Sequence, residues 1–284
     1  DRIVAVAGAG AERRVEIESL VSHYAAVDAS HIRWNPDGTN ETVLTYRNEQ
    51  ERDEALLERV PPLDREGLEP VMDADYHLVN FISGKEMSLA LWEEFHEARG
   101  GFCVADIQSL TLTFGKNKRG HRSLPEWRRW VAPVDVVKGN ESEWRWLLGG
   151  EKPFAGTLQE LASLVLAEGP STLLITRGGD GHVLAWKEIK HAYYAEIPAL
   201  PVSDEDFVDS TGCGDVFASG YLLGVMRGEK PLAASLLAGT LASESARLRG
   251  IPQLARLADP ADLRAASYGR WWKRAQSHWK GERL

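Results

Sequence analysis

Short apolar runs alternate along this chain with stretches that carry apolar residues at helical spacing. Each run is continuous, and polar or glycine residues follow it. The runs cover residues 3–7, 77–82, 102–105, 134–137 and 173–175. Continuous apolarity is typical of strands buried on both faces of a parallel sheet. Helical patterns at 86–98 and 157–168 lie between the runs, and this order predicts a doubly wound, mainly parallel α/β sheet flanked by helices.

Two regions add to this alternation. Residues 42–46 read Thr-Val-Leu-Thr-Tyr, are polar on both sides, and follow an Asp-Gly turn signal at 37–38, so we expect a strand of a small separate sheet. Towards the C-terminus, residues 232–249 and 262–279 are predicted helices. The second carries Trp271, Trp272 and Trp279, which we expect to pack against the core, with a partner surface as the alternative.

Composition and charge narrow the class of protein. The 284 residues suit one large α/β domain or two small ones. A net charge of −9 argues against nucleic acid as a partner. The 2 cysteines provide neither a disulfide framework nor a zinc pattern, which fits a reducing cytoplasm. No apolar run reaches the length of a membrane span. We therefore expect a cytoplasmic protein with neither nucleic-acid nor membrane partners.

Residues 209–215, Asp-Ser-Thr-Gly-Cys-Gly-Asp, are the most informative segment. The apolar run 216–225 follows at once and is long enough for a buried helix. Gly212, Cys213 and Gly214 are therefore predicted at a helix N-terminus, where unpaired N–H groups and the helix dipole favour an anion. Asp215 is placed to accept a proton from an attacking hydroxyl. Taken alone, Gly-x-Gly-Asp is equally compatible with a glycine turn before an acidic first helical turn.

Two other segments place polar residues after a strand. In 134–143, Asn140 and Glu143 have the spacing of a capping box, and both also lie where parallel strands face a ligand crevice. These two interpretations are compatible with each other. Residues 173–181, Leu-Leu-Ile-Thr-Arg-Gly-Gly-Asp-Gly, predict a strand and a glycine turn, with 182–186 as a returning strand of a hairpin.

A basic segment lies in the middle of the chain. It contains Lys116, Lys118, Arg119, His121 and Arg122. We expect a solvated loop, with contact to a phosphorylated or acidic acceptor as the alternative. Ser123 and Glu126 then have capping-box spacing and are predicted to open a helix that carries Trp127 and Trp130.

Together these motifs resemble those of the ribokinase (PfkB-type) family of carbohydrate and nucleoside kinases. Residues 209–215 are similar to its signature Asp-Thr-x-Gly-Ala-Gly-Asp, with Ser210 for Thr and Cys213 for Ala. The segment 140–143 matches Asn-x-x-Glu, and 176–181 matches Thr-x-Gly-x-x-Gly. The three motifs occur in the family's order, and the resemblance covers most of the chain.

The resemblance implies ATP-dependent phosphorylation of a hydroxyl on a sugar or sugar-like small molecule. Asp215 would be the catalytic base, and the turn of Gly212, Cys213 and Gly214 the anion hole. The residues implied in nucleotide binding are Thr176, Gly178, Gly181, Asn140 and Thr211. Mg²⁺ would be held by Asn140 and Glu143, mainly through water, and a monovalent cation, K⁺, near Asp209.

The resemblance also bears on the domain organisation. It implies a small β lid over about residues 32–50, which would cover the sugar site and offer a homodimer surface. The family's first signature, Gly-Gly-x-x-x-Asn, and an early Asp are expected before the run 3–7 and are not found, whereas residues 8–12 are similar to the glycine–acid segment that follows it. We therefore expect a single ribokinase-like domain over 1–284 that lacks the family's N-terminal segment.

A further departure concerns the substrate. Residues 106–109 read Asp-Ile-Gln-Ser where many sugar kinases of the family have Asp-x-Asn-x-Arg, which weakens the case for a fructokinase-like substrate. Two alternatives therefore stand beside a sugar kinase: a nucleoside or vitamin-precursor kinase, and a non-catalytic sugar- or nucleotide-binding protein of kinase descent. A dinucleotide-binding dehydrogenase is remote, because Gly8-x-Gly10 lacks a third glycine in register.

Overall fold

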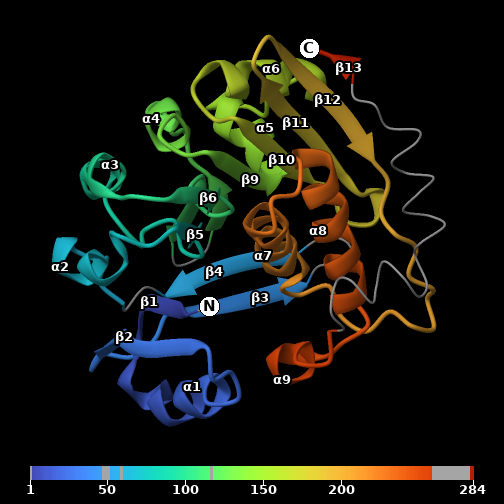
Figure 1. Cartoon of the computed structure of the whole chain (residues 1–284). Coiled ribbons are helices and arrows are strands. Elements are labelled where there is room, and N and C mark those ends of the chain that lie inside the picture. Colours follow the sequence, from blue (N-terminus) through green and yellow to red (C-terminus); the bar gives the residue numbers. More distant parts are fainter. Residues whose placement is uncertain (1, 47–51, 58–59, 116–117, 258–281) are drawn as a thin grey trace.

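Among the residues that the structure describes, seven strands form the central sheet (Figure 1). The computed structural model describes residues 2–46, 52–57, 60–115, 118–257 and 282–284. The strand order is β13-β12-β11-β10-β9-β6-β5; the pairs among β5, β6, β9 and β10 are parallel, and those beyond β10 are antiparallel. The strands are β5 (Tyr76–Asn80), β6 (Phe102–Asp106), β9 (Val136–Asn140), β10 (Thr172–Thr176), β11 (His182–Glu188), β12 (His191–Ile197) and β13 (Glu282–Arg283). The predicted hairpin of β10 and β11 is confirmed.

Helices cover both faces of this sheet (Figure 1). One face packs against α3 (Leu89–Ala98), α4 (Trp127–Val131), α5 (Glu141–Gly149) and α6 (Leu158–Ala167), and the other against α7 (Cys213–Met226) and α8 (Pro231–Ser245). Neighbouring strand residues divide between the two cores: Leu173 and Ile175 belong to the first and Leu174 to the second. The predicted doubly wound sheet, buried on both faces in its central strands, is confirmed.

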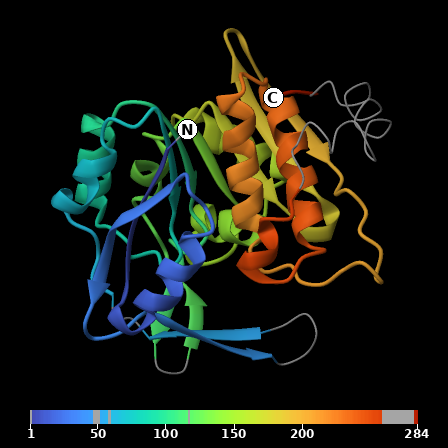
Figure 2. The ribbon, with the colours of Figure 1, turned by 60° about the horizontal axis from the view of Figure 1, so that its bottom comes forward.

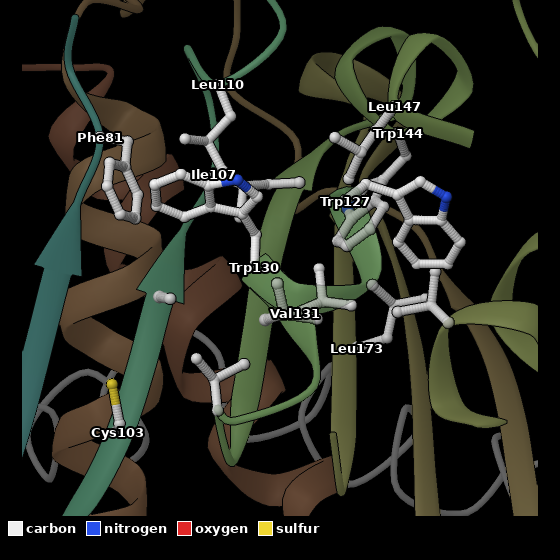
Figure 3. Packing of buried hydrophobic residues seen from close by; sticks show 14 of the residues in the cluster. Phe81, Cys103, Ile107, Leu110, Trp127, Trp130, Val131, Trp144, Leu147 and Leu173 are labelled. Carbon is white, nitrogen blue, oxygen red and sulfur yellow. The ribbon is translucent and has the colours of Figure 1, made fainter. Parts of the chain in front are cut away.

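Aromatic packing fixes the end of β5, where the chain leaves the sheet (Figure 3). Phe81 follows β5 directly and meets the ring of Trp130 edge to face at 5.4 Å between centroids. The indole N–H of the fully buried Trp92 donates to the Trp130 carbonyl at 3.0 Å. Large aromatic side chains contribute strongly to burial, and edge-to-face pairs add a preferred geometry. This packing holds the carboxyl end of β5 against α3 and α4.

Small residues let α7 and α8 pack closely on the opposite face. A Cβ on Gly224 would lie 2.7 Å from the Ala234 Cα, and one on Gly220 would lie 3.0 Å from the Ala238 Cα. Glycine therefore allows an approach that any side chain would prevent. The predicted buried helix after the glycine motif and the predicted helix at 232–249 are both confirmed, as α7 and α8. The close packing sets the position of the α7 N-terminus relative to the sheet.

The first strand lies apart from the main sheet. β1 (Ile3–Gly10) pairs in parallel with β2 (Val27–Asn35) in a separate two-stranded sheet, and α1 (Arg14–Val21) connects them. The prediction that the run 3–7 is buried on both faces is wrong, since Ile3 is 57% exposed and the rest of that run is intermediate or exposed. The run pairs with β2 outside the main sheet, and its residue Val6 packs against the first core. α2 (Arg65–Leu68) leads from this part towards β5.

Two antiparallel hairpins project side by side from the body (Figure 2). β3 (Glu41–Tyr46) pairs with β4 (Arg52–Leu57), which confirms the predicted small separate sheet, and β7 (Leu112–Gly115) pairs with β8 (Lys118–His121) in contact with β4. The basic segment therefore forms a strand at 118–121, where a loop was predicted, because it pairs with β7; residue 116 lies outside the described residues. Residues 32–35 of the expected lid lie in β2.

Helix starts differ in how well the sequence predicts them. The capping box predicted at Ser123 and Glu126 is wrong: α4 begins at Trp127, after Pro125, and Glu126 at its start makes no side-chain cap. The short α9 (Gly250–Leu254) follows α8, and the predicted helix at 262–279 with its tryptophans lies outside the described residues.

Within the described residues, no helix combines the length and apolar character that crossing a membrane requires.

Candidate active site

Polar side chains stand at the carboxyl ends of neighbouring parallel strands. Asn80 ends β5, Asp106 ends β6, and Lys138 lies near the end of β9. In the register of the sheet Asn80 is opposite Asp106, and Asp106 is opposite Lys138. Open α/β sheets bind their ligands at this edge. Asn80 and Lys138 were not predicted as site residues; their positions at strand ends are the only sequence signal for them.

The predicted glycine turn lies at the start of α7. Gly212 is the N-cap residue with φ +81°, a conformation that favours glycine. The N–H of Cys213 donates to the Ser210 carbonyl at 3.2 Å, whereas no hydrogen bond to the described residues involves the N–H of Gly212 or Gly214. Gly212 and Gly214 therefore supply the donors with which the turn can hold an anion.

The thiol in this turn is neutral. Burial raises the pKa of Cys213 above its ordinary value, and the Ser245 hydroxyl donates to Sγ at 3.3 Å. Asp209 stabilises the preceding residues, because its Oδ1 accepts from the Thr211 N–H at 2.9 Å. These bonds from Thr211 also hold the pKa of Asp209 below its ordinary value. A neutral thiol adds no negative charge that would repel an anion at the turn.

Asp215 stands in the first turn of α7 and is half-buried. The Asn80 amide donates to its Oδ1 at 2.5 Å, across 135 positions of sequence. Its Oδ2 lies 3.9 Å from where a Cβ on Gly212 would be, so the second oxygen faces the glycine turn. Asn80 Oδ1 is buried and has no hydrogen-bond partner among the described residues. The carboxylate is thus oriented by β5 and presents one oxygen beside the anion-binding donors.

A buried ion pair lies next to this turn. The Lys138 ammonium donates to Asp106 Oδ2 at 2.5 Å, and the side chains are 4% and 0% exposed. Asp106 Oδ1 accepts from the Gln108 N–H at 3.2 Å. Burial raises the pKa of Asp106 above its ordinary value, and the attraction of Lys138 offsets part of this rise. A Cβ on Gly214 would lie 3.0 Å from Lys138 Nζ, so the ammonium touches the first turn of α7.

A cavity of about 300 Å³ opens from the same turn. Five of the predicted site residues line it: Thr176, Gly178, Gly181, Cys213 and Gly214. The structure thus brings the glycine turn after β10 and the glycine turn before α7 to one cavity, whose lining is mainly apolar. Such concave, mainly apolar sites with a few polar groups suit small-molecule ligands.

His182 also lines this cavity, and sequence reasoning missed it. Burial lowers its pKa to about 3, so the imidazole is neutral. Its Nε2 is buried without a hydrogen-bond partner among the described residues, and its ring packs edge-on against Phe217 at 4.8 Å. Only its place directly after the Gly181 turn gives a sequence signal. A neutral imidazole can donate and accept one hydrogen bond each.

The other predicted site residues lie outside the cavity lining. Asn140 and Glu143 form the predicted capping box: Asn140 Oδ1 accepts from the Glu143 N–H at 2.9 Å, and Glu143 Oε2 accepts from the Asn140 N–H at 2.6 Å. Asp209 and Thr211 flank the second glycine turn. Among the described residues no three His, Cys, Asp or Glu side chains cluster as metal ligands.

Comparison with known proteins gives the family. The sequence model of the pfkB family of carbohydrate kinases matches residues 22–252, and the chain belongs to this family. This places it among the phosphotransferases.

One curated relative is a cytidine kinase of Thermococcus kodakarensis, 37% identical over 105 residues. The matched part covers 37% of this chain and spans 34% of that protein, about a third of its length.

Solved structures share the fold at low identity. A pyrophosphate-dependent kinase of the ribokinase family has a TM-score of 0.71 at 18% identity, covering 90% of this chain and 85% of its own. The Arabidopsis thaliana ribokinase, solved with ribose and ATP, has a TM-score of 0.70 at 17% identity, covering 92% of this chain and 80% of its own. These similarities confirm a ribokinase-like fold.

Proposed function

We propose that this protein transfers the γ-phosphoryl group of Mg·ATP to a hydroxyl of a sugar or sugar-like small molecule. The observation that carries the proposal is the position of Asp215: its oriented carboxylate lies beside unpaired N–H donors at a helix N-terminus, at the end of a mainly apolar cavity. A proton acceptor next to an anion site is the arrangement that phosphoryl transfer to an alcohol requires.

Each group has a role in this reaction. The acceptor oxygen attacks the γ-phosphorus, the bond from that phosphorus to the ADP oxygen breaks, and the hydroxyl proton passes to Asp215. Asn80 holds one oxygen of Asp215 and leaves the other for the hydroxyl. The N–H groups of Gly212 and Gly214 stabilise negative charge on the oxygens of the moving group, and Cys213 keeps the turn closed through its bond to Ser210.

The donor lies in the cavity, with its base end away from Gly214. Thr176, Gly178 and Gly181 form one wall, and the neutral His182 offers a polar group that does not change its charge at physiological pH. This supports a nucleotide as donor, because inorganic pyrophosphate has no group to fill the apolar part of the cavity. Thr211 would contact the phosphates from the turn, and K⁺ near Asp209 remains a prediction.

Asn140 and Glu143 would hold Mg²⁺ through water, and the ion would neutralise charge on the donor phosphates. Both residues also cap α5, so a substitution affects stability as well as metal use. The chain offers a matched control, because Thr157 and Glu160 form a second capping box at the start of α6.

We expect Asn140→Ala and Thr157→Ala to lower the free energy of unfolding by similar amounts, about 1 kcal/mol each. Only Asn140→Ala should raise the Mg²⁺ concentration needed for half-maximal activity. Urea unfolding without nucleotide and a Mg²⁺ titration of ADP release measure the two effects. Equal Mg²⁺ dependence in the two variants would limit Asn140 to capping.

The test of the proposed function is ADP release from Mg·ATP against sugars, sugar acids and nucleosides, with Asp215→Ala as the blank. Phosphate release from pyrophosphate with the same acceptors tests a second donor. We expect turnover with ATP and one acceptor class, absent in the blank. Silence with every acceptor, or turnover that persists in the blank, contradicts the proposal. Turnover with pyrophosphate and none with ATP would show that pyrophosphate is the donor.

A nucleoside acceptor is the second candidate, and the 37% identity to a cytidine kinase over 105 residues favours it. The same panel decides between the two, because cytidine and ribose differ only by the base. Preference for cytidine over ribose in kcat/KM would assign a nucleoside kinase. A homodimer that meets through the expected lid at about 32–50 stays a prediction, to be checked by the molar mass in solution.

A further inference from the structure

Lys138 is a buried cation at the reacting end of the site, and the mechanism above does not use it. Its side chain is 4% exposed, and its ammonium touches the first turn of α7 at Gly214. The N–H of Gly214 also makes no hydrogen bond to the described residues and is left to hold an anion. The ammonium and the backbone donors therefore face the same small region.

The hydrogen bonds of this ammonium are incomplete. A lysine ammonium carries three N–H donors. Asp106 Oδ2 accepts one of them, and no other hydrogen bond of Lys138 is present among the described residues. Burying a charge is unfavourable unless it is paired and hydrogen-bonded. Two donors are thus available to a ligand next to Gly214.

The electrostatics point the same way. A cation near a helix N-terminus is unfavourable, because the helix dipole is positive there. Here the ammonium touches the turn at the positive end of the α7 dipole, and the carboxylates of Asp106 and Asp215 lie nearby and balance this charge. Asp106 is itself fixed, since its two oxygens accept from Lys138 and from the Gln108 N–H. The ammonium and the free N–H groups at the helix N-terminus thus lie where an incoming anion could contact both.

We propose that Lys138 is a further catalytic residue, whose ammonium contacts an oxygen of the transferred phosphoryl group, and that Asp106 positions it. This inference rests on the proposed function. In phosphoryl transfer the charge on these oxygens is stabilised by preorganised donors, and a desolvated ammonium is a strong one. The contact complements the N–H groups of Gly212 and Gly214 from the sheet side of the site.

The variant Lys138→Met keeps the length of the side chain and removes its charge. We expect kcat to fall by about 100-fold with KM for the acceptor nearly unchanged, because the contact strengthens as charge develops. A second readout needs no turnover: calorimetric binding of inorganic tripolyphosphate should weaken by about tenfold, since one charged hydrogen bond is lost. Lys187→Met is the matched control, because Lys187 lies on β11 and its ammonium donates to the Gly169 carbonyl, away from the α7 turn.

Lys138→Met leaves Asp106 buried without its partner and can prevent folding. The double variant Asp106→Asn/Lys138→Met removes both charges and keeps the test available. A folded double variant with wild-type kcat and wild-type tripolyphosphate affinity would reduce the pair to a structural role and overturn the inference. Absence of tripolyphosphate binding in the wild type would overturn it too.

The two proposals fail in different ways. Silence of the wild type with every acceptor contradicts the proposed function, while weaker tripolyphosphate binding by Lys138→Met still supports the anion contact. If the wild type turns over and the Lys138→Met variant has the same kcat and the same tripolyphosphate affinity, only the role of Lys138 is contradicted.

Discussion

Replacing Asp215 with asparagine lowers kcat by about 10²–10⁴-fold, the contribution expected of a general base. The amide has the shape of the carboxylate and still accepts from Asn80, but it cannot take the hydroxyl proton. The donor cavity does not include Asp215, so affinity for ATP should stay close to that of the wild type. Steady-state kinetics with the best acceptor and calorimetric titration with ATP measure the two quantities.

Asp73→Asn is the control for this variant. Asp73 is an exposed residue in the turn before β5, and the same change there should alter neither kcat nor the melting temperature. An Asp215→Asn protein that keeps wild-type kcat would show that Asp215 is not the base. If the variant lost both ATP binding and turnover, the N-terminus of α7 would be disrupted. A lower melting temperature would reveal this disruption.

Replacing Gly181 with alanine should lower the stability of the protein and also weaken its use of ATP. Gly181→Ala is strongly destabilising, because Gly181 has φ +94° and its new Cβ would lie 2.0 Å from the Ile197 carbonyl oxygen and 2.5 Å from the Ala199 N. The strained backbone alone costs about 1–3 kcal/mol. Gly181, Ile197 and Ala199 all line the cavity, so relief of the contact moves its wall and should raise KM for ATP.

Alanine variants of two neighbouring glycines distinguish the effect of backbone strain from the effect of moving the cavity wall. Gly178 has φ +57° with no atom within 4 Å of an added Cβ, so Gly178→Ala should lose about 1–2 kcal/mol of stability without moving the cavity wall. An alanine at Gly179, which has open space and no positive φ, should be nearly neutral. Urea unfolding and KM for ATP of the three variants test this order. Equal behaviour of all three would contradict the assigned backbone role of Gly181.

Local sequence signals predicted much of the fold because they depend on residues close in the chain. The capping box at Asn140 and Glu143 formed as predicted, since its donors and acceptors are three residues apart. At Ser123 and Glu126 the same spacing failed, because the chain reaches Pro125 before the helix begins. The same spacing thus forms a capping box where its first residue is the N-cap, as at Asn140, and fails where the N-cap is its second residue, Glu126.

Pairing between distant strands was less predictable. The run 3–7 has the composition of a buried strand, yet β1 pairs only with β2 among the described strands and stays partly exposed. The segment 118–121 is basic and still forms β8, because β7 supplies the hydrogen-bond partners. Backbone pairing depends on which strand lies alongside, and composition does not specify that neighbour.

The sequence by itself determined the alternation of the central strands and helices, the family motifs and the glycine turn before Asp215, because each is written in consecutive residues. Only the tertiary structure decided which side chains meet there. Asn80 reaches Asp215 across 135 positions, and Lys138 reaches the same turn from β9. The strand order and the close packing of α7 on α8 bring these groups together. Such contacts depend on how the whole chain packs, and no short segment encodes them.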